Sequence, residues 1–242
     1  MEYKHFSHQH NLNIYKVQEG QQCRCHGCQS LCDDTIYACW TCNFFLHDHC
    51  GNATRYVKHP AHPLHPLILI PSPTYCSGSF VCNACGGVGN GFSYCCALCE
   101  IDLHINCTFL PPKICHKAHQ HELVVSFGSQ DQKGAPEFCK ICTKEVNSKN
   151  WSYRCLEPEC DFRVHTYCGT SEVKPGLYQG DDPDSEIPET SKDSCQTNGD
   201  QSQPAPPTPS DPAAELLDLQ LRMQMAQQLS QMMASFNLSQ FV

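Results

Sequence analysis

Pairs of cysteines with the spacing Cys-x2-Cys recur along this chain at a fixed interval, and they constrain its fold more than any other feature. The pairs that begin at Cys25, Cys82 and Cys139 are 57 residues apart both times. A fixed period of this length marks tandem repeats of one structural unit. Each pair is followed by further cysteines and then by a His-x2-Cys motif. The sequence therefore predicts three copies of a small cysteine- and histidine-rich domain.

Each copy contains eight candidate metal ligands in one order: two histidines, four cysteines, one histidine and one cysteine. Structural zinc takes four such ligands tetrahedrally, so eight ligands make two closed sites. The order predicts interleaved sites: the first cysteine pair joins the final His-x2-Cys, and the second cysteine pair joins the N-terminal histidines. The predicted ligands are His8, His10, Cys25, Cys28, Cys39, Cys42, His47 and Cys50; His62, His65, Cys82, Cys85, Cys96, Cys99, His104 and Cys107; and His119, His121, Cys139, Cys142, Cys155, Cys160, His165 and Cys168.

One ligand in each copy has a competitor. His59 and Cys115 follow the first two copies at a distance where a C-terminal ligand would lie, and the third copy has no Cys or His in that place. The pair of N-terminal histidines occurs in all three copies. We therefore prefer the histidine pair as part of the site, and the alternative stays open from the sequence.

The high cysteine content also fits a secreted disulfide scaffold, since 21 of 242 residues are cysteine. However, the start of the chain lacks the apolar run of a secretory signal, and disulfides would leave the 14 histidines unexplained. We therefore expect about two zinc ions per repeat, six per chain, in a reducing compartment such as the cytoplasm or the nucleus. We expect no transmembrane helix, because no run of about 18 apolar residues occurs.

The charge of the chain is acidic and unevenly distributed, with a formal net charge of −9. Residues 171–242 carry 3 Lys and Arg against 11 Asp and Glu, a net of −8. No dense basic run of the kind that binds nucleic acid occurs in the sequence. The charge pattern therefore gives no support to a DNA or RNA partner.

The segments between the ligands predict short strands. Apolar residues alternate with polar ones after the N-terminal histidines and before the last histidine of each copy, and this period of two indicates strands with one buried face. A unit this small buries too little apolar surface to fold alone, so zinc must supply the missing free energy. We therefore expect three small zinc-stabilised β-rich domains, over residues 5–59, 60–116 and 117–170.

The ligand order, with Tyr37, Tyr94 and Tyr153 before the second cysteine pair, resembles that of the divergent C1 (DC1) domains. These are cysteine/histidine-rich relatives of the diacylglycerol-binding zinc domain of protein kinase C, and they are expanded in plants. The resemblance covers about residues 5–169. It implies a C1-like fold with two interleaved zinc sites per copy and a role in plant stress or hormone signalling. The spacing Cys107-x7-Cys115 also matches the last step of the C1 pattern, which keeps Cys115 open as a ligand.

The lipid function of C1 domains does not transfer easily to this sequence. The gaps between the two cysteine pairs are 10, 10 and 12 residues, shorter than in typical lipid-binding members. The middle gap contains a glycine-rich loop, 86–91, with only Val88 to insert. Membrane insertion needs exposed apolar area and basic flanks. Diacylglycerol binding is therefore an alternative that the sequence disfavours.

Closed zinc sites leave no open coordination position, so we expect no enzymatic activity. Cys-x2-Cys pairs also occur in dithiol redox proteins, and interleaved zinc sites also occur in ubiquitin-ligase modules. The redox motif usually stands alone at a helix start, and the ligase module places its histidine differently among the cysteines. The sequence favours a non-enzymatic, zinc-dependent adaptor for protein interaction and signalling.

The C-terminal part has a different character. Residues 171–212 are rich in proline, acidic and polar residues, which predicts a disordered linker. Apolar residues then recur every three or four positions, which predicts an amphipathic helix over 213–240. Its Leu/Met face needs a partner, through self-association, docking on the zinc repeats or binding another protein. Leu217-x-Leu219-x-Leu221 also resembles the motif with which plant repressors recruit Groucho-like corepressors.

Overall fold

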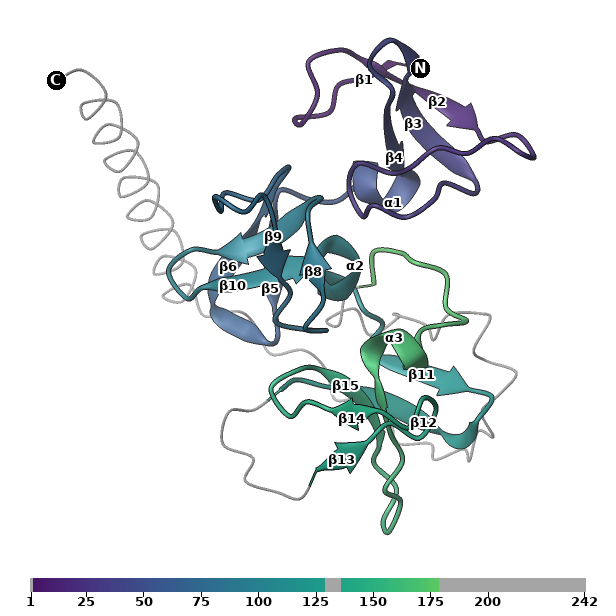
Figure 1. Cartoon of the computed structure of the whole chain (residues 1–242), viewed down its shortest axis with the longest axis vertical. Helices are drawn as coiled ribbons and strands as arrows, with labels where there is room; N and C mark the ends of the chain where they lie inside the picture. Colours follow the sequence, from purple (N-terminus) through teal and green to yellow (C-terminus); the bar gives the residue numbers. More distant parts are fainter. Residues whose placement is uncertain (1, 129–135, 179–242) are drawn as a thin grey trace, which may run out of the picture. The chain divides into compact units, whose positions relative to one another are not determined.

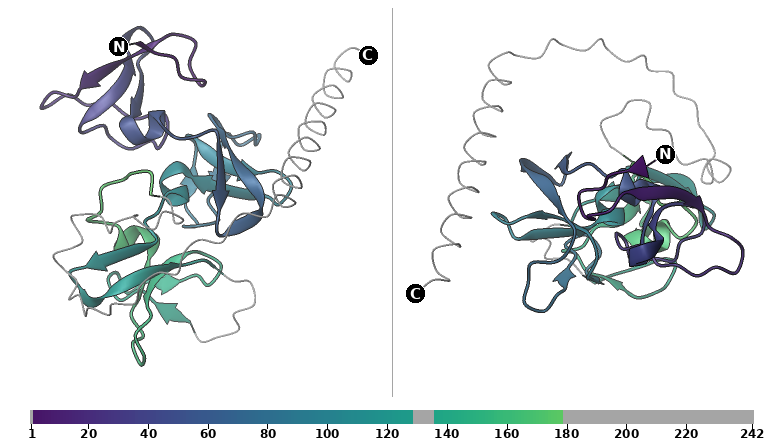
Figure 2. Two further views of the ribbon diagram at one scale, coloured as in Figure 1. Left: turned by 180° about the vertical axis from the view of Figure 1, so that it is seen from behind. Right: turned by 90° about the horizontal axis from the view of Figure 1, so that it is seen from above.

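The computed structural model describes residues 2–128 and 136–178. Within these ranges the chain forms three four-stranded antiparallel sheets and two two-stranded hairpins (Figure 1). Each four-stranded sheet is followed directly by one short helix (Figures 1 and 2). Most of the predicted linker 171–212 and all of the predicted helix 213–240 lie outside the described residues. None of the helices in the described ranges is long and apolar enough to cross a membrane.

The first repeat is a meander of four strands. Its elements are β1 (Glu2–Tyr3), β2 (Leu12–Lys16), β3 (Thr35–Cys39), the 3-10 turn η1 (Trp40–Cys42), β4 (Phe44–His47) and α1 (Asp48–Gly51). The strands pair in chain order, β1-β2-β3-β4. Leu12 is fully buried, but Ile14 is 53% exposed. Only the first apolar residue of the predicted alternation on β2 therefore contributes to the core.

The second repeat has the same arrangement with an additional hairpin. Its elements are β5 (Tyr56–His59), β6 (His62–Ile70), β7 (Phe80–Val81), β8 (Val88–Gly89), β9 (Ser93–Cys96), β10 (Ile101–His104) and α2 (Ile105–Thr108). The sheet has the order β10-β9-β6-β5, and β7 pairs with β8 around the first cysteine pair. Leu67 and Leu69 are both fully buried. The predicted alternation on β6 therefore lines the core.

The third repeat repeats this topology. Its elements are β11 (Lys113–His116), β12 (His119–Ser126), β13 (Glu137–Phe138), β14 (Glu145–Val146), β15 (Ser152–Cys155), β16 (Arg163–His165) and α3 (Thr166–Gly169). The sheet has the order β11-β12-β15-β16, and β13 pairs with β14. Leu123 and Val164 are fully buried between the strands. The same small sheet is thus built three times from the same pattern of apolar residues.

The pairing of strands β5 and β11 places the boundaries of the repeats earlier in the chain than predicted. The predicted repeats 5–59 and 60–116 place residues 56–59 in the first repeat and residues 113–116 in the second. Instead, β5 pairs with β6 and β11 pairs with β12, each through a tight turn in which His59 lies opposite His62 and His116 opposite His119. These edge strands belong to the following sheet because backbone hydrogen bonding, not ligand spacing, defines the domain. The second and third repeats therefore begin several residues earlier than predicted.

A tyrosine on the central strand lies at the core of the second and third sheets. Tyr94 and Tyr153 are fully buried, and their hydroxyl groups donate to the backbone oxygens of Thr54 and Pro111. These acceptors lie in the segments that lead into β5 and β11. A buried hydroxyl needs such a partner, since an unpaired one costs free energy. The tyrosines therefore attach the entry of each repeat to its sheet.

Candidate metal centres

The structure brings the predicted ligands together in groups of four. In each group one sulfur or ring nitrogen per residue lies within 4.8 Å of the others. Five such groups are His8, His10, Cys39 and Cys42; Cys25, Cys28, His47 and Cys50; His62, His65, Cys96 and Cys99; Cys82, Cys85, His104 and Cys107; and His119, His121, Cys155 and Cys160. In the remaining set, Cys142 Sγ and Cys168 Sγ lie 3.4 and 3.9 Å from His165 Nδ1, and Cys139 contacts both cysteines.

The distances within the groups fit a tetrahedral zinc ion. Zn–S bonds of about 2.3 Å and Zn–N bonds of about 2.0 Å place a sulfur and a nitrogen ligand roughly 3.5 Å apart. The observed Sγ–N distances are 3.1 Å for Cys42–His10, 3.3 Å for Cys28–His47, 3.3 Å for Cys99–His65, 3.4 Å for Cys85–His104, 3.6 Å for Cys155–His121 and 3.5 Å for Cys160–His119. The ligand atoms are therefore arranged as an ion would require.

A tight turn around each first cysteine pair directs its two sulfur atoms to one side. The N–H of Gln29 donates to the carbonyl of Cys25 over 2.9 Å, and Gly86 and Thr143 form the equivalent bonds in the other repeats. These three residues have φ values of +64°, +72° and +60°. The left-handed region is disfavoured by roughly 1–2 kcal/mol for residues other than glycine. Gln29 and Thr143 adopt it because the turn between two ligands requires it.

Backbone N–H groups also stabilise the ionised form of the sulfur ligands. The N–H groups of Gly27 and His47 lie 3.3 and 3.4 Å from Cys25 Sγ. Zinc binds the thiolate and not the thiol. These N–H groups therefore favour metal binding.

In the first and third repeats the last histidine is oriented by a backbone carbonyl. His47 directs Nδ1 to Cys28, and its Nε2 lies 3.0 Å from the carbonyl oxygen of Leu31. His165 has the same arrangement, with Nε2 3.0 Å from the carbonyl oxygen of Glu145. A donor bond from one ring nitrogen fixes the tautomer and leaves the other nitrogen as the ligand. The peptide chain thus sets both the ring orientation and the ligand atom.

The first N-terminal histidine faces its group through Nε2. The Nε2 atoms of His8 and His62 are buried and have no hydrogen-bond partner within the described part of the chain. A buried polar atom without a partner is costly, and a zinc ion within the group would provide the partner. Phe44 stacks on His8 at 4.4 Å, and Phe162 stacks on His119 at 4.2 Å. These rings hold the ligand histidines in place.

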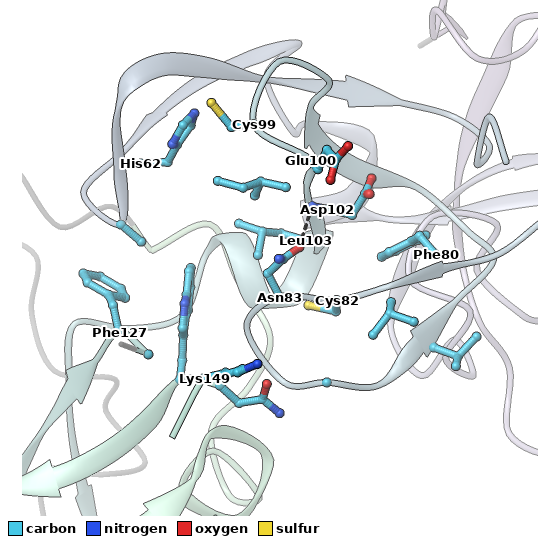
Figure 3. A pocket seen from close by; sticks show the side chains of 18 of the residues that line it. His62, Phe80, Cys82, Asn83, Cys99, Glu100, Asp102, Leu103, Phe127 and Lys149 are labelled. Atoms are coloured by element: carbon cyan, nitrogen blue, oxygen red, sulfur yellow. Dashed lines mark hydrogen bonds between the residues drawn. The ribbon is translucent and has the colours of Figure 1, made fainter. Parts of the chain in front are cut away.

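The N-terminal histidine pairs complete the groups. The four-residue groups of the adjoining repeats contain neither His59 nor Cys115. In Figure 3, His62 lies beside Cys99, whereas Cys82, which belongs to the other group of the same repeat, lies apart from them. The second cysteine pair thus meets histidines that are more than thirty residues earlier in the chain. This is the interleaved arrangement.

A further histidine precedes each N-terminal pair by three residues, and of these three only His59 was considered from the sequence, as a candidate ligand. His5, His59 and His116 are buried, with 2%, 8% and 5% exposure. Their Nδ1 atoms accept the backbone N–H two residues later, over 3.3, 3.1 and 3.1 Å. They close the turn before the first ligand histidine in all three copies. Their recurrence in the sequence was the available signal.

Burial lowers the pKa of His59 to about 4, from an ordinary value of 6.5. The unfolded chain therefore binds more protons between these values, and stability falls as the pH falls through this window. We expect His59→Gln to reduce this loss in the zinc-loaded protein, because glutamine does not titrate and can still accept the Ala61 N–H. The free energy of unfolding, determined in urea at pH 7 and at pH 5, measures this loss of stability. His26→Gln, at an exposed histidine, is the control, and equal pH dependence of the two variants would contradict the expectation.

A family model described as the C1 domain matches residues 60–108 and 117–169. Each match contains all eight ligands of its repeat. The first repeat lies outside both matches, but it has the same ligand order and the same two groups of four. Comparisons with curated proteins and with solved structures gave no significant match. Residues 60–108 and 117–169 are therefore two C1 domains of the divergent (DC1) type, and the Cys/His groups identify a zinc-binding protein.

Proposed function

We propose that this protein is a non-enzymatic adaptor in which six zinc ions hold three C1-type repeats as a scaffold for protein partners. The observation that carries this proposal is the composition of the metal groups, each with four protein ligands. Catalytic zinc usually has three protein ligands and an open position for water or substrate. Four ligands support a structural role for the metal. The reducing environment that free thiolate ligands need supports a cytoplasmic or nuclear location.

An apolar side chain is exposed in the turn of the second cysteine pair in every repeat. Trp40, Leu98 and Leu156 lie within the second cysteine pair of their repeats and are 45%, 63% and 61% exposed. Single exposed apolar residues are ordinary on protein surfaces. Their recurrence at one turn of three repeats supports a shared role in binding, because such apolar positions are favoured contacts for protein partners.

The combined variant Trp40→Ser, Leu98→Ser and Leu156→Ser is expected to lose specific partners while it keeps its zinc. Tagged full-length protein would be purified from cells of the source tissue, and bound proteins would be quantified by mass spectrometry. The control variant is Tyr56→Ser and Leu64→Ser, which removes exposed apolar residues elsewhere. An unchanged set of partners in the triple variant, with zinc content preserved, would exclude this surface as the binding site.

The leucine-rich C-terminal segment is the second place where a partner would bind. Its Leu217-x-Leu219-x-Leu221 pattern favours a corepressor that takes the segment as an extended peptide, and its helical pattern of apolar residues favours a protein that binds a helix. Replacing these three leucines with alanine in the same purification separates partners of the tail from partners of the repeats. Self-association through the tail would appear as a concentration-dependent mass that the alanine variant lacks.

A second candidate function is binding to a lipid surface. Val81 and Val88, on the hairpin β7–β8, are 63% and 71% exposed, so this hairpin offers two apolar side chains and not one. Insertion of two valines without a basic flank gives weak membrane affinity at best. Sedimentation with diacylglycerol-containing phosphatidylserine vesicles tests this candidate. Zinc-dependent binding that Val81→Ser and Val88→Ser abolish would favour it over the adaptor proposal.

A further inference from the structure

Consecutive repeats contact each other in the same way at two junctions. The residue two positions before the core tyrosine is Phe92 in the second repeat and Trp151 in the third. The N–H of Phe92 donates to the carbonyl of Gly27 over 2.8 Å, and the N–H of Trp151 donates to the carbonyl of Ala84 over 2.7 Å. Gly27 and Ala84 occupy the same position inside the first cysteine pair of the preceding repeat. Each junction thus places an aromatic residue on a metal-binding turn.

The aromatic rings at the two junctions also stack on equivalent histidines. Phe92 stacks on His5 at 5.9 Å with an interplanar angle of 8°, and Trp151 stacks on His59 at 4.9 Å and 21°. Phe92 and Trp151 are 2% and 7% exposed. Trp151 belongs to the hydrophobic cluster of the first two repeats and not to that of the third. The non-ligand histidines therefore have a second role as platforms for the next repeat.

At each junction two residues face each other, and one of the two is a glycine. The glycine belongs to the later repeat at the first junction and to the earlier repeat at the second. At the first junction a Cβ atom on Gly91 would lie 2.3 Å from the carbonyl oxygen of Gly27 and 3.0 Å from Gln29. At the second junction Asn150 takes the place of Gly91, and Gly86 takes the place of Gln29. A Cβ atom on Gly86 would lie 2.3 Å from the Asn150 amide nitrogen. Each junction therefore has one glycine where two side chains would clash, which indicates a matched interface.

The first repeat lacks the junction aromatic residue, and the third repeat lacks the small residue within its first cysteine pair. The first repeat has Thr35 at the position of the junction aromatics. The third repeat has Ile141 at the position of Gly27 and Ala84, and Ile141 is 36% exposed whereas Ala84 is fully buried. Terminal repeats of an array differ from internal ones because they have a neighbour on one side only. The substitutions follow this rule.

From these contacts we infer that the three repeats dock head to tail as one block, in which each incoming aromatic residue clamps the first zinc turn of the repeat before it. The hydrogen bond is made by a residue between the two cysteines of that turn. Docking and zinc retention are therefore coupled. A groove of about 1040 Å³ follows the second junction, where Phe127 and Lys149 of the third repeat lie across from Asn83 of the second (Figure 3). Docking of the two repeats creates this groove.

Trp151→Ala in the full-length, zinc-loaded protein tests the second junction. Hydrogen–deuterium exchange of the turn 82–87 and the rate of zinc transfer to a competing chelator are the two measurements. Loss of a buried aromatic contact at an interface centre is expected to speed release of one zinc on the order of tenfold and to deprotect the turn. Phe138→Ala is the control, because Phe138 lies in the same repeat and is 55% exposed. Unchanged exchange at 82–87 in Trp151→Ala would overturn the coupling.

Gly91→Val tests the first junction without removing a core residue. The backbone of Gly91 is not in the left-handed region, so valine is compatible with its conformation and clashes only across the junction. We expect faster exchange and zinc release at the turn 25–29, with the turn 82–87 unaffected. If Trp151→Ala unfolds the third repeat and releases its two zinc ions, the result for Gly91→Val decides whether docking and zinc retention are coupled. Wild-type exchange at 25–29 would mean independent repeats, a result that leaves the partner-binding proposal intact.

Discussion

Removal of zinc is expected to unfold all three repeats. Apparent zinc binding contributes about 10–16 kcal/mol per structural site in small zinc domains, comparable to or above the whole stability of an ordinary domain. The hydrophobic cluster of the third repeat has only eight buried residues, three of them cysteine ligands, among the described residues. Without metal these thiolates and histidines would repel one another or lose solvation. The apo chain therefore has too little apolar burial to offset its conformational entropy.

The measurement is a chelator titration followed by near-UV and far-UV circular dichroism, with metal content determined by mass spectrometry. We expect close to six zinc ions per chain before chelation, loss of the β signal as they leave, and recovery on addition of zinc under reducing conditions. A magnesium-saturated chelator, which still removes zinc but not background divalent cations, is the control. A chain that keeps its tertiary signal with less than one zinc bound would refute the structural role of the metal.

Paired ligand substitutions are expected to reveal the interleaved arrangement in the count of zinc ions. Cys25 and His47 belong to one group, and Cys39 belongs to the other group of the same repeat. Cys25→Ser combined with His47→Ala should therefore cost one zinc ion, because both changes damage the same site. Cys25→Ser combined with Cys39→Ser should cost two. Changes within one site are strongly non-additive, whereas changes in separate sites add.

Native mass spectrometry at saturating zinc gives these counts directly. Cobalt substitution gives an independent check, because interleaved sites have three and two thiolates, whereas one site built from both cysteine pairs would have four thiolates and leave one for the other site, and the charge-transfer bands depend on thiolate number. Cys76→Ser, at an exposed cysteine outside the groups, is the matched control. Loss of two ions from Cys25→Ser with His47→Ala, and of one ion from Cys25→Ser with Cys39→Ser, would instead support a site built from both cysteine pairs, and loss of two ions from each variant would support sites in chain order.

The ligand types and the repeat period were predictable because they are local. A Cys-x2-Cys turn is formed by four neighbouring residues, and its spacing is visible without knowledge of the rest of the chain. Alternating apolar residues predicted strands such as β6 and β12 for the same reason, since side-chain direction on a strand depends on the nearest neighbours. The C1 resemblance followed from these short patterns. The exposure of Ile14 was not predictable from this local pattern, because burial of a strand residue depends on which distant segments cover that part of the sheet.

Contacts between distant residues required the tertiary structure. Ring nitrogens of His65 and His121 meet sulfur atoms 34 residues away, and spacing alone could not choose between these histidines and His59 or Cys115. The assignment of β5 to the second sheet likewise depends on backbone pairing across a turn. The sequence by itself thus determined the zinc-binding, Cys/His-rich character of this chain and predicted three repeats with eight candidate ligands each. The tertiary structure decided which ligands share an ion and how Phe92 and Trp151 join the repeats, because these depend on packing across folded surfaces that no local pattern encodes.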